Sequence, residues 1–261
     1  MRLHVPSDSG TSCAGLLEQF PDAALDKVTR STIPLLAFWC DESRRRALLE
    51  ALAVQHPADA EAVFEHRTPW KCDRCNPPAQ KATDSHTDVM VWTPQVVVAV
   101  EAKYREALYE STDRWLDRGS VRANREAVLD HWLHLIGTDT PRERVGGLIY
   151  QMLHRTAAAC HWSRKQGAAR TIVLLLDLGE GHAEEYARAL ADVGTVLQIA
   201  DRVEFWNAQV PASPTREARA LAAEQPEASE SFSARVREGL DGNQLYTFPA
   251  PSEWHVHRVG S

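Results

Sequence analysis

The segment that most constrains the fold runs from residue 86 to residue 105 and reads HTDVMVWTPQVVVAVEAKYR. Alternating residues from Asp88 to Trp92 and a β-branched run from Val96 to Val100 are both typical of β-strands. Between them, Thr93-Pro94-Gln95 places a proline at a position that tight turns favour. The sequence therefore predicts a β-hairpin that turns at Pro94.

The predicted hairpin brings charged side chains together. If it folds about the Pro94–Gln95 bond, facing residues have numbers that sum to 189, and Asp88 lies opposite Glu101. Lys103 points to the same face as Glu101, because side chains along a strand repeat every two residues. Two carboxylates and an ammonium group are thus expected to converge at the end of a hydrophobic strand.

Neighbouring carboxylates in a low-dielectric setting repel each other unless a cation compensates them. Carboxylate oxygens, backbone carbonyls and waters are the ligands that Mg²⁺ accepts, so Asp88 and Glu101 are predicted ligands of Mg²⁺ or Mn²⁺. Lys103 would orient or activate the attacking water, or stabilise charge on a phosphate. The alternative is an edge-strand ion pair between Glu101 and Lys103, with Asp88 capping a turn.

Asp88 followed by Glu101-Ala102-Lys103 at the end of a hydrophobic strand resembles the PD-(D/E)XK phosphodiesterase superfamily of restriction-endonuclease-like folds. Thr87 stands where that family usually has a proline. The resemblance covers roughly residues 35 to 206 and implies an α/β fold, a central mixed sheet flanked by helices. It also implies an acidic residue on an early helix and often a polar residue on a later one.

Glu42 and Gln151 are the candidates for these two positions. Glu42 lies in the first turn of a helix predicted from Asp41 to Gln55, where it would alternatively only complement the helix dipole. Gln151 would orient the site lysine or bind the nucleic-acid backbone, unless it is an ordinary exposed glutamine. Related nucleases sometimes have a Gln-x-x-x-Tyr pattern here, but position 155 is arginine.

Gln151 falls in a long helix predicted from Pro141 to about Lys165. The pair Gly146-Gly147 weakens such a helix unless something approaches closely, and close packing or nucleic acid would both explain it. Further helices are predicted at Ala107–Leu116, Arg122–Ile136 and His182–Leu190, and further strands at Thr171–Leu178 and Val203–Trp206.

The length of 261 residues fits one domain with extensions. We expect an N-terminal extension over residues 1–34, a nuclease-like domain over 35–210, and a C-terminal extension over 211–261. The last is rich in Ala, Glu, Ser and Pro and is predicted to be partly helical, near Ser233 to Leu240, or mobile.

The formal net charge is −7, but it is unevenly distributed. Residues 103–170 hold 12 basic against 8 acidic residues, whereas residues 171–261 hold 7 against 14. Five arginines of the basic part could contact a nucleic-acid backbone with modest affinity, unless they are merely solvated: Arg105, Arg114, Arg118, Arg122 and Arg125. No apolar run approaches a membrane span and no secretory signal is visible, so we expect a cytoplasmic protein.

Five cysteines do not indicate a secreted disulfide scaffold. Cys72 and Cys75 form a C-x-x-C pair that, with His66 and His86, could hold a zinc ion bracing the segment before the hairpin. The alternative is a loop with reduced thiols. A nucleophilic cysteine site is a further alternative, built from Cys160 with His161 or His154, although the sequence shows no activating geometry for it.

The function expected from the resemblance is a metal-dependent nuclease, an endonuclease or exonuclease, that hydrolyses phosphodiester bonds of nucleic acid. DNA is the expected substrate, and a homodimer is common in such folds. The alternative is a catalytically silent nucleic-acid-binding or assembly protein that retains the nuclease fold. The presence of all three of Asp88, Glu101 and Lys103 favours the enzyme.

Overall fold

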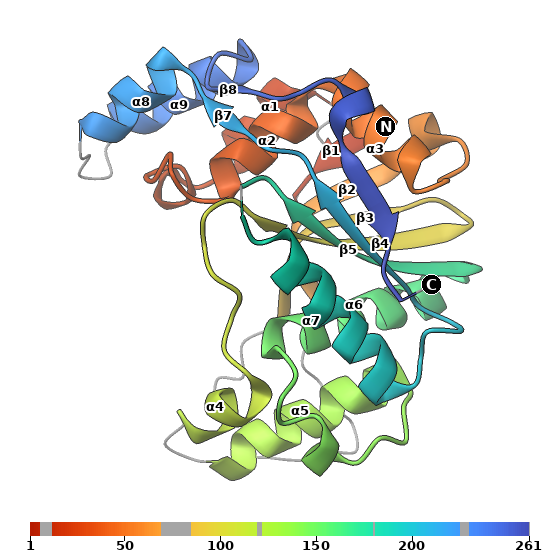
Figure 1. The fold of residues 1–261 in the computed structure, drawn as a ribbon. Helices are drawn as coiled ribbons and strands as arrows, with labels where there is room; N and C mark the ends of the chain where they lie inside the picture. The colour runs from red at the N-terminus through yellow and green to blue at the C-terminus, as the bar shows by residue number, and fades with distance from the viewer. Residues whose placement is uncertain (6–11, 69–84, 119–121, 180, 225–229, 261) are drawn as a thin grey trace.

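The computed structural model describes residues 1–5, 12–68, 85–118, 122–179, 181–224 and 230–260. Within these ranges, seven strands form one mixed sheet in the order β1-β2-β3-β4-β5-β6-β9 (Figure 1). The strands are β1 Arg2–His4, β2 Glu61–Thr68, β3 Ser85–Trp92, β4 Val96–Lys103, β5 Arg170–Asp177, β6 Glu204–Gln209 and β9 His255–Arg258. Strands β2, β3 and β4 are antiparallel neighbours, whereas β4, β5 and β6 run parallel.

The predicted hairpin is confirmed. β3 and β4 pair from Val89 with Val100 to Trp92 with Val97, the register in which residue numbers sum to 189. Every residue of β4 is buried, because helices cover both faces of the sheet at this strand. The predicted parallel addition of the next strand is also confirmed, since β5 pairs with β4 along its whole length.

Helices cover the two faces of the sheet. On one face lie α1 Cys13–Gln19, α2 Thr32–Cys40, α3 Glu42–Ala51, α8 Arg216–Ala223 and α9 Glu230–Asp241. On the other lie α4 Thr112–Asp117, α5 Arg122–Ile136, α6 Tyr150–Gln166 and α7 Ala183–Leu197. Strand β4 contributes to both cores by alternation, with Val98 and Val100 on the α2 side and Val97 and Ala99 on the α6 side. The chain is therefore an α/β protein with a mixed central sheet flanked by helices.

The prediction of one long helix from Pro141 to Lys165 is wrong in its first part. A 3₁₀ turn spans Arg142–Arg144, and α6 begins only at Tyr150. Gly146 lies in the break, where an added Cβ would stand 2.3 Å from a carboxylate oxygen of Asp113, whereas Gly147 has no atom within 4 Å of such a Cβ. Close packing against α4 thus accounts for Gly146.

The remaining helices differ from their predicted ranges mainly at their ends. α5 spans Arg122–Ile136 as predicted, whereas α4 begins at Thr112 and α7 continues to Leu197. Asp41 is the N-cap of α3, where its side chain accepts hydrogen bonds from the backbone N–H groups of Ser43 and Arg44. Among the described segments, no helix is both long and apolar enough to cross a membrane.

Both ends of the chain belong to the central structure. β1 pairs with β2 at one edge of the sheet, and β9 pairs with β6 at the other. Leu240, Tyr246 and Trp254 are buried in the same core as α2 and α3. A small second sheet joins β7 Ser213–Pro214 to β8 Tyr246–Thr247. The residues described after position 210 are therefore packed onto the domain and include a strand of its main sheet.

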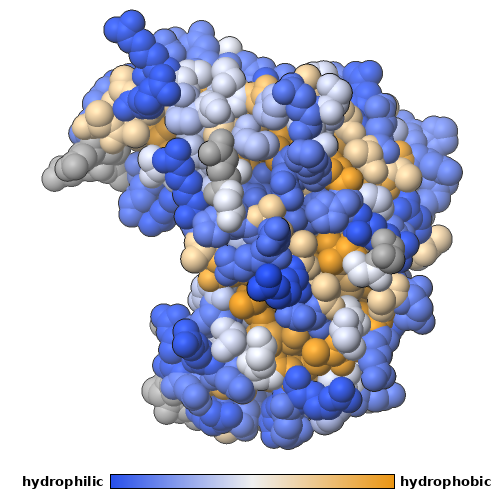
Figure 2. Space-filling model, in the orientation of Figure 1, coloured by the Kyte–Doolittle hydropathy of each residue, from blue (hydrophilic) through white to orange (hydrophobic). Residues whose placement is uncertain are grey.

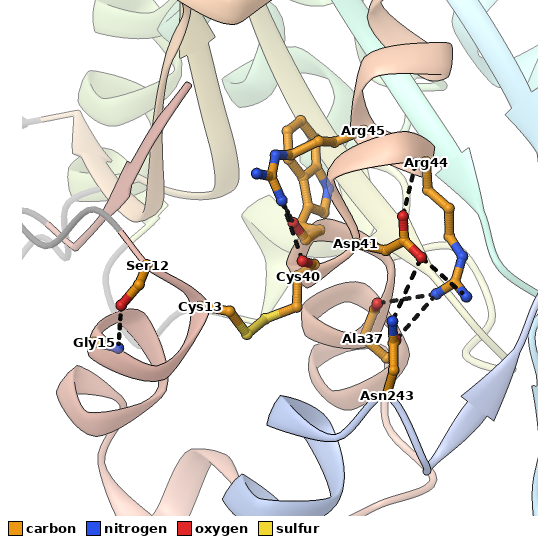
Figure 3. Close-up of a disulfide and its surroundings, with 10 residues drawn as sticks. Ser12, Cys13, Gly15, Ala37, Cys40, Asp41, Arg44, Arg45 and Asn243 are labelled. Atoms are coloured by element: carbon orange, nitrogen blue, oxygen red, sulfur yellow. Dashed lines mark hydrogen bonds and ion pairs between the residues drawn. A yellow bond between two sulfur atoms is a disulfide. The ribbon is translucent and has the colours of Figure 1, made fainter.

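A disulfide between Cys13 and Cys40 joins α1 to the end of α2 (Figure 3). The two cysteines are 27 residues apart, and their Cα atoms lie 5.2 Å from each other. Their spacing in the sequence carries no signal for this bond, since α1 and α2 come together only in the fold, where both contact α9. Cys160 is buried and free.

We expect the disulfide to stabilise the native state by about 3–4 kcal/mol, the scale for closing a loop of this length in the unfolded chain. A reductant should therefore lower the melting temperature of the wild-type protein, as measured by calorimetry. The double variant Cys13→Ser/Cys40→Ser is the matched control, and its melting temperature should be low and insensitive to reductant. Equal melting temperatures for the oxidised wild type and the double variant would contradict a stabilising bond.

Candidate active site

The candidate site lies where β3 begins and β4 ends, on the side of the sheet covered by α6. Asp88 is fixed there by its own hairpin, because its Oδ2 accepts a hydrogen bond of 2.7 Å from the backbone N–H of Ala102. Its side chain remains 24% exposed. Asp88 therefore lies beside the end of β4, as the hairpin register predicts.

Glu101 is the most buried acidic group of the site, with 2% of its side chain exposed. The ammonium group of Lys103 lies 2.9 Å from its Oε1, and the amide of Gln151 donates to the same oxygen. Arg155 donates from Nε to the other oxygen, Oε2. Three side chains thus satisfy the Glu101 carboxylate, which explains how it can be buried at all.

Arg155 connects the two carboxylates. Besides its bond to Glu101, it places Nη2 3.4 Å from Asp88 Oδ1. Its Nη1 donates to the carbonyl of His86 and lies 3.4 Å from Oγ1 of Thr87. The residue is only 3% exposed. Gln151 thus lies at the site, where its contact is with Glu101, and its predicted role in orienting the lysine or binding nucleic acid stays a prediction; the contacts of Arg155 were not predicted.

A signal for Arg155 does exist in the sequence. Positions 151 and 155 are one helical turn apart and therefore share a face of α6. The apolar residues of this helix form the more conspicuous stripe, and a polar pair beside it looks like a solvated edge. The polar pair is part of the interior only because it contacts the buried carboxylate of Glu101 on β4.

The electrostatics of the site follow from this arrangement. Burial, and then the neighbouring charge of Glu101, raise the pKa of Asp88 from its ordinary value of 3.8 to about 7. The Arg155 guanidinium and the Ala102 N–H oppose that rise. With both acids ionised, two negative charges face the two positive charges of Lys103 and Arg155.

The oxygen atoms of the site fit a hard divalent cation. Among the described residues, the partner of Asp88 Oδ1 is Arg155, at the long distance of 3.4 Å, and Gln151 Oε1 is buried without a hydrogen-bond partner. Two carboxylates and an amide oxygen are ligands that Mg²⁺ and Mn²⁺ accept. No group of three or more His, Cys, Asp or Glu side chains suited to a metal occurs within the described ranges, so water would complete the coordination.

The structure does not bring Glu42 to this site. Glu42 lies at the start of α3, on the opposite face of the sheet from α6, and its side chain is 70% exposed. It forms ion pairs with Arg46 at 3.1 Å and Arg45 at 4.0 Å. The prediction of Glu42 as the accessory acid is therefore wrong, and its alternative reading as a first-turn glutamate describes it.

The two histidines of the predicted zinc set lie in different surroundings. His66 is buried, with its ring 4.5 Å from that of Trp162, and burial lowers its pKa to about 4. His86 is 44% exposed and lies 3.7 Å from Glu65. Neighbouring rungs of the β2–β3 ladder carry the two residues, and a shared zinc would require His66 to leave its aromatic packing. Cys72 and Cys75 lie outside the described residues.

The nucleophilic cysteine alternative has no support in the local chemistry. Burial raises the pKa of the Cys160 thiol to about 11, so the reactive thiolate is disfavoured. His154 instead forms a 2.7 Å hydrogen bond with Ser85 through Nδ1, and burial holds its pKa well below the usual range.

The end of β5 forms the other side of the site. The N–H of Leu178 donates to the carbonyl of Lys103 at 2.7 Å, and Asp177 pairs with Lys103 in the sheet. Gly179 follows directly, and an added Cβ there would fall 1.7 Å from the carbonyl oxygen of Tyr104. The path of the backbone just after Lys103 therefore depends on a glycine at position 179.

A family model described as a domain of unknown function, DUF6946, matches residues 11–210. The chain belongs to this family. The matched region of DUF6946 includes all five residues of the site: Asp88, Glu101, Lys103, Gln151 and Arg155. No curated protein and no solved structure matches the chain.

Gly179→Ala should destabilise the protein by about 2–3 kcal/mol, because the new methyl group collides with backbone that cannot rotate away. Calorimetry or chemical unfolding measures the loss. Gly147→Ala is the matched control and should leave stability unchanged or slightly raised, since its Cβ meets no atom within 4 Å. Equal stabilities of the two variants would contradict the close approach of Gly179 to Tyr104.

The raised pKa of Asp88 predicts a pH-dependent stability. A carboxyl that keeps its proton in the folded state up to about pH 7 stabilises that state at low pH, and the contribution is lost as the pH rises from about 4 through 7. Asp88→Asn should therefore match the wild type near pH 4 and exceed it by about 1–2 kcal/mol at pH 8, with solvent at the part-exposed side chain reducing the effect.

Unfolding in urea across this pH range, without divalent metal, tests the prediction. Asp192→Asn, at an exposed position of α7, controls for the change in net charge. A pH-independent difference between Asp88→Asn and the wild type would rule out the raised pKa.

Proposed function

We propose that this chain is a metal-dependent nuclease that hydrolyses phosphodiester bonds of nucleic acid, with DNA as the expected substrate. The observation that carries the proposal is the meeting of Asp88, Glu101 and Lys103 at one strand end. These three residues are adjacent for a structural reason, the hairpin register, and their types suit phosphodiester hydrolysis. The sequence resemblance to PD-(D/E)XK phosphodiesterases supports the same function.

Asp88 and Glu101 would hold Mg²⁺ or Mn²⁺. A bound divalent cation supplies Lewis-acid charge and lowers the pKa of a coordinated water. Lys103 uses one of its three donors on Glu101 Oε1, which leaves donors for a water or a phosphate oxygen. Gln151 holds Glu101 in its orientation by donating to the same oxygen. Each residue thus has a role defined by its contacts.

The substrate would approach from the edge where β4 and β5 end. Figure 1 shows the chain leaving β4 and running down the left edge to α4. At the same height, the left outline of the molecule in Figure 2 is indented. The carboxyl ends of parallel strands are the usual place for ligand sites in α/β sheets. The 24% exposure of Asp88 gives the site contact with solvent.

Two of the five predicted surface arginines are paired with acidic side chains. Arg118 and Arg122 each form an ion pair with a neighbouring glutamate, at 2.8 and 3.0 Å. Arg125 packs over the indole of Trp115, with its guanidinium carbon 4.9 Å from the ring centroid. Paired arginines contribute less to phosphate binding, which fits modest affinity for nucleic acid.

One observation favours a second function. The Arg155 guanidinium touches both carboxylates and supplies positive charge where a metal would otherwise be required. A chain with this ion-pair network could bind nucleic acid, or assemble with other proteins, without cleaving its ligand. Divalent-metal binding and cleavage distinguish the two functions.

The test is a cleavage assay with Mg²⁺ or Mn²⁺ on plasmid, linear duplex, single-stranded DNA and RNA. Asp88→Asn and Glu101→Gln should each abolish metal-dependent cleavage, because each removes a ligand charge. Glu42→Gln is the matched control, since Glu42 lies on the opposite face of the sheet, and it should cleave like the wild type. Full activity in either site variant would refute the site, and metal-independent binding without cleavage would favour the second function.

Lys103→Ala separates metal binding from turnover. The ammonium group is not a ligand, and the variant removes a positive charge from the site, so calorimetric titration should give Mn²⁺ binding at least as tight as that of the wild type. Cleavage should fall by ~10²-fold or more, the scale of positioned acid-base and electrostatic groups. Loss of Mn²⁺ binding in this variant would show that the role of Lys103 is wrongly assigned.

A further inference from the structure

Arg155 is held at the site by every nitrogen of its guanidinium. Nε bonds Glu101, Nη1 bonds the His86 carbonyl, and Nη2 lies 3.4 Å from Asp88. Arg155 is a residue of α6, so the packing of this helix against the sheet determines where its side chain meets the hairpin. A guanidinium does not lose its proton in a protein, so its charge is permanent.

The position of this charge matters for a metal. A divalent cation bound by Asp88 and Glu101 would lie close to the guanidinium that already contacts both of them. Like charges at such separations repel strongly where water is scarce. Arg155 and a divalent cation are therefore competitors for the same carboxylates.

The structure also indicates which of the two contacts of Arg155, with Glu101 or with Asp88, would break when a metal binds. The bond from Arg155 to Glu101 is fully buried, whereas the 3.4 Å contact to Asp88 is long and involves a side chain that is 24% exposed. Asp88 also accepts a hydrogen bond from the Ala102 N–H on its other oxygen, Oδ2, which Arg155 does not contact. The Asp88 end of the bridge is thus the weaker one and faces solvent.

We propose that Arg155 is a resident cation of the carboxylate pair, and that a divalent metal binds only when Arg155 gives up its contact with Asp88. Arg155 is then the residue that sets the metal affinity of the site: it holds the pair together without metal and weakens metal binding. This inference rests on the proposed function for the metal and its ligands.

The test measures Mn²⁺ binding to the full chain by calorimetry. Arg155→Gln should bind Mn²⁺ at least ~10-fold more tightly than the wild type, because one positive charge leaves the site while the ligands remain. In chelator, the same variant should melt at a lower temperature than the wild type, since the buried Glu101 keeps only Lys103 as a counterion and Asp88 loses its contact with Arg155. Added Mn²⁺ should raise its melting temperature more than that of the wild type.

Two controls assign the effect to this site. Arg188→Gln makes the same charge change at an exposed position of α7 and should leave the Mn²⁺ affinity unchanged. The double variant Asp88→Asn/Arg155→Gln lacks one carboxylate and should lose the tight binding. Tight binding by the double variant would place the metal elsewhere and overturn the inference.

The outcomes separate this inference from the proposed function. Equal or weaker Mn²⁺ binding by Arg155→Gln overturns the inference even if the wild type cleaves DNA. Binding by Arg155→Gln but not by the wild type supports the inference and refutes nuclease activity of the native chain. Absence of binding by both overturns the inference and the proposed function together.

A second variant covers the case in which Arg155→Gln does not fold. Arg155→Lys keeps a positive charge in the interior, but its three donors sit on one nitrogen, which cannot reach Glu101, the His86 carbonyl and Asp88 together. It should leave Asp88 freer and bind Mn²⁺ more tightly than the wild type, but less tightly than Arg155→Gln, because the positive charge remains. An affinity equal to or weaker than that of the wild type would overturn the inference.

Discussion

A buried carboxylate at the end of a fully buried strand is the constraint on which the site and its surroundings depend. Glu101 cannot stay ionised in the sheet interior without donors, and the strand itself supplies only Lys103. The other donors come from α6, which therefore has to present polar residues at two positions of a helix that is otherwise packed against the sheet. The burial of Glu101 thus depends on the placement of α6.

The parts of the structure that local patterns determine could be predicted from the sequence. The hairpin register follows from a proline turn and a two-residue period, and it correctly placed Asp88 near Glu101 and Lys103. The parallel pairing of β5 with β4 follows from a second apolar run after a helix. These features need only the covalent geometry of strands and the burial of apolar side chains.

The parts that depend on distant contacts could not be predicted in the same way. The break before α6 depends on how closely Gly146 approaches Asp113, and the Cys13–Cys40 bond depends on the packing of two helices. Glu42 was assigned through the family pattern, but α3 packs on the other face of the sheet. The contact of Arg155 with both acids likewise appears only when helix and hairpin are seen together.

The positions of the two terminal strands have a consequence for solubility. β1 and β9 occupy the two outer places of the sheet, so the first and the last described strands cover backbone groups that would otherwise be open to other chains. The family match ends at residue 210, just beyond β6. A chain cut there would expose the unpaired side of β6, with the half-buried Trp206 on it, and exposed edges of this kind template aggregation. The segment after residue 210 therefore covers, with β9, a side of β6 that would otherwise be unpaired.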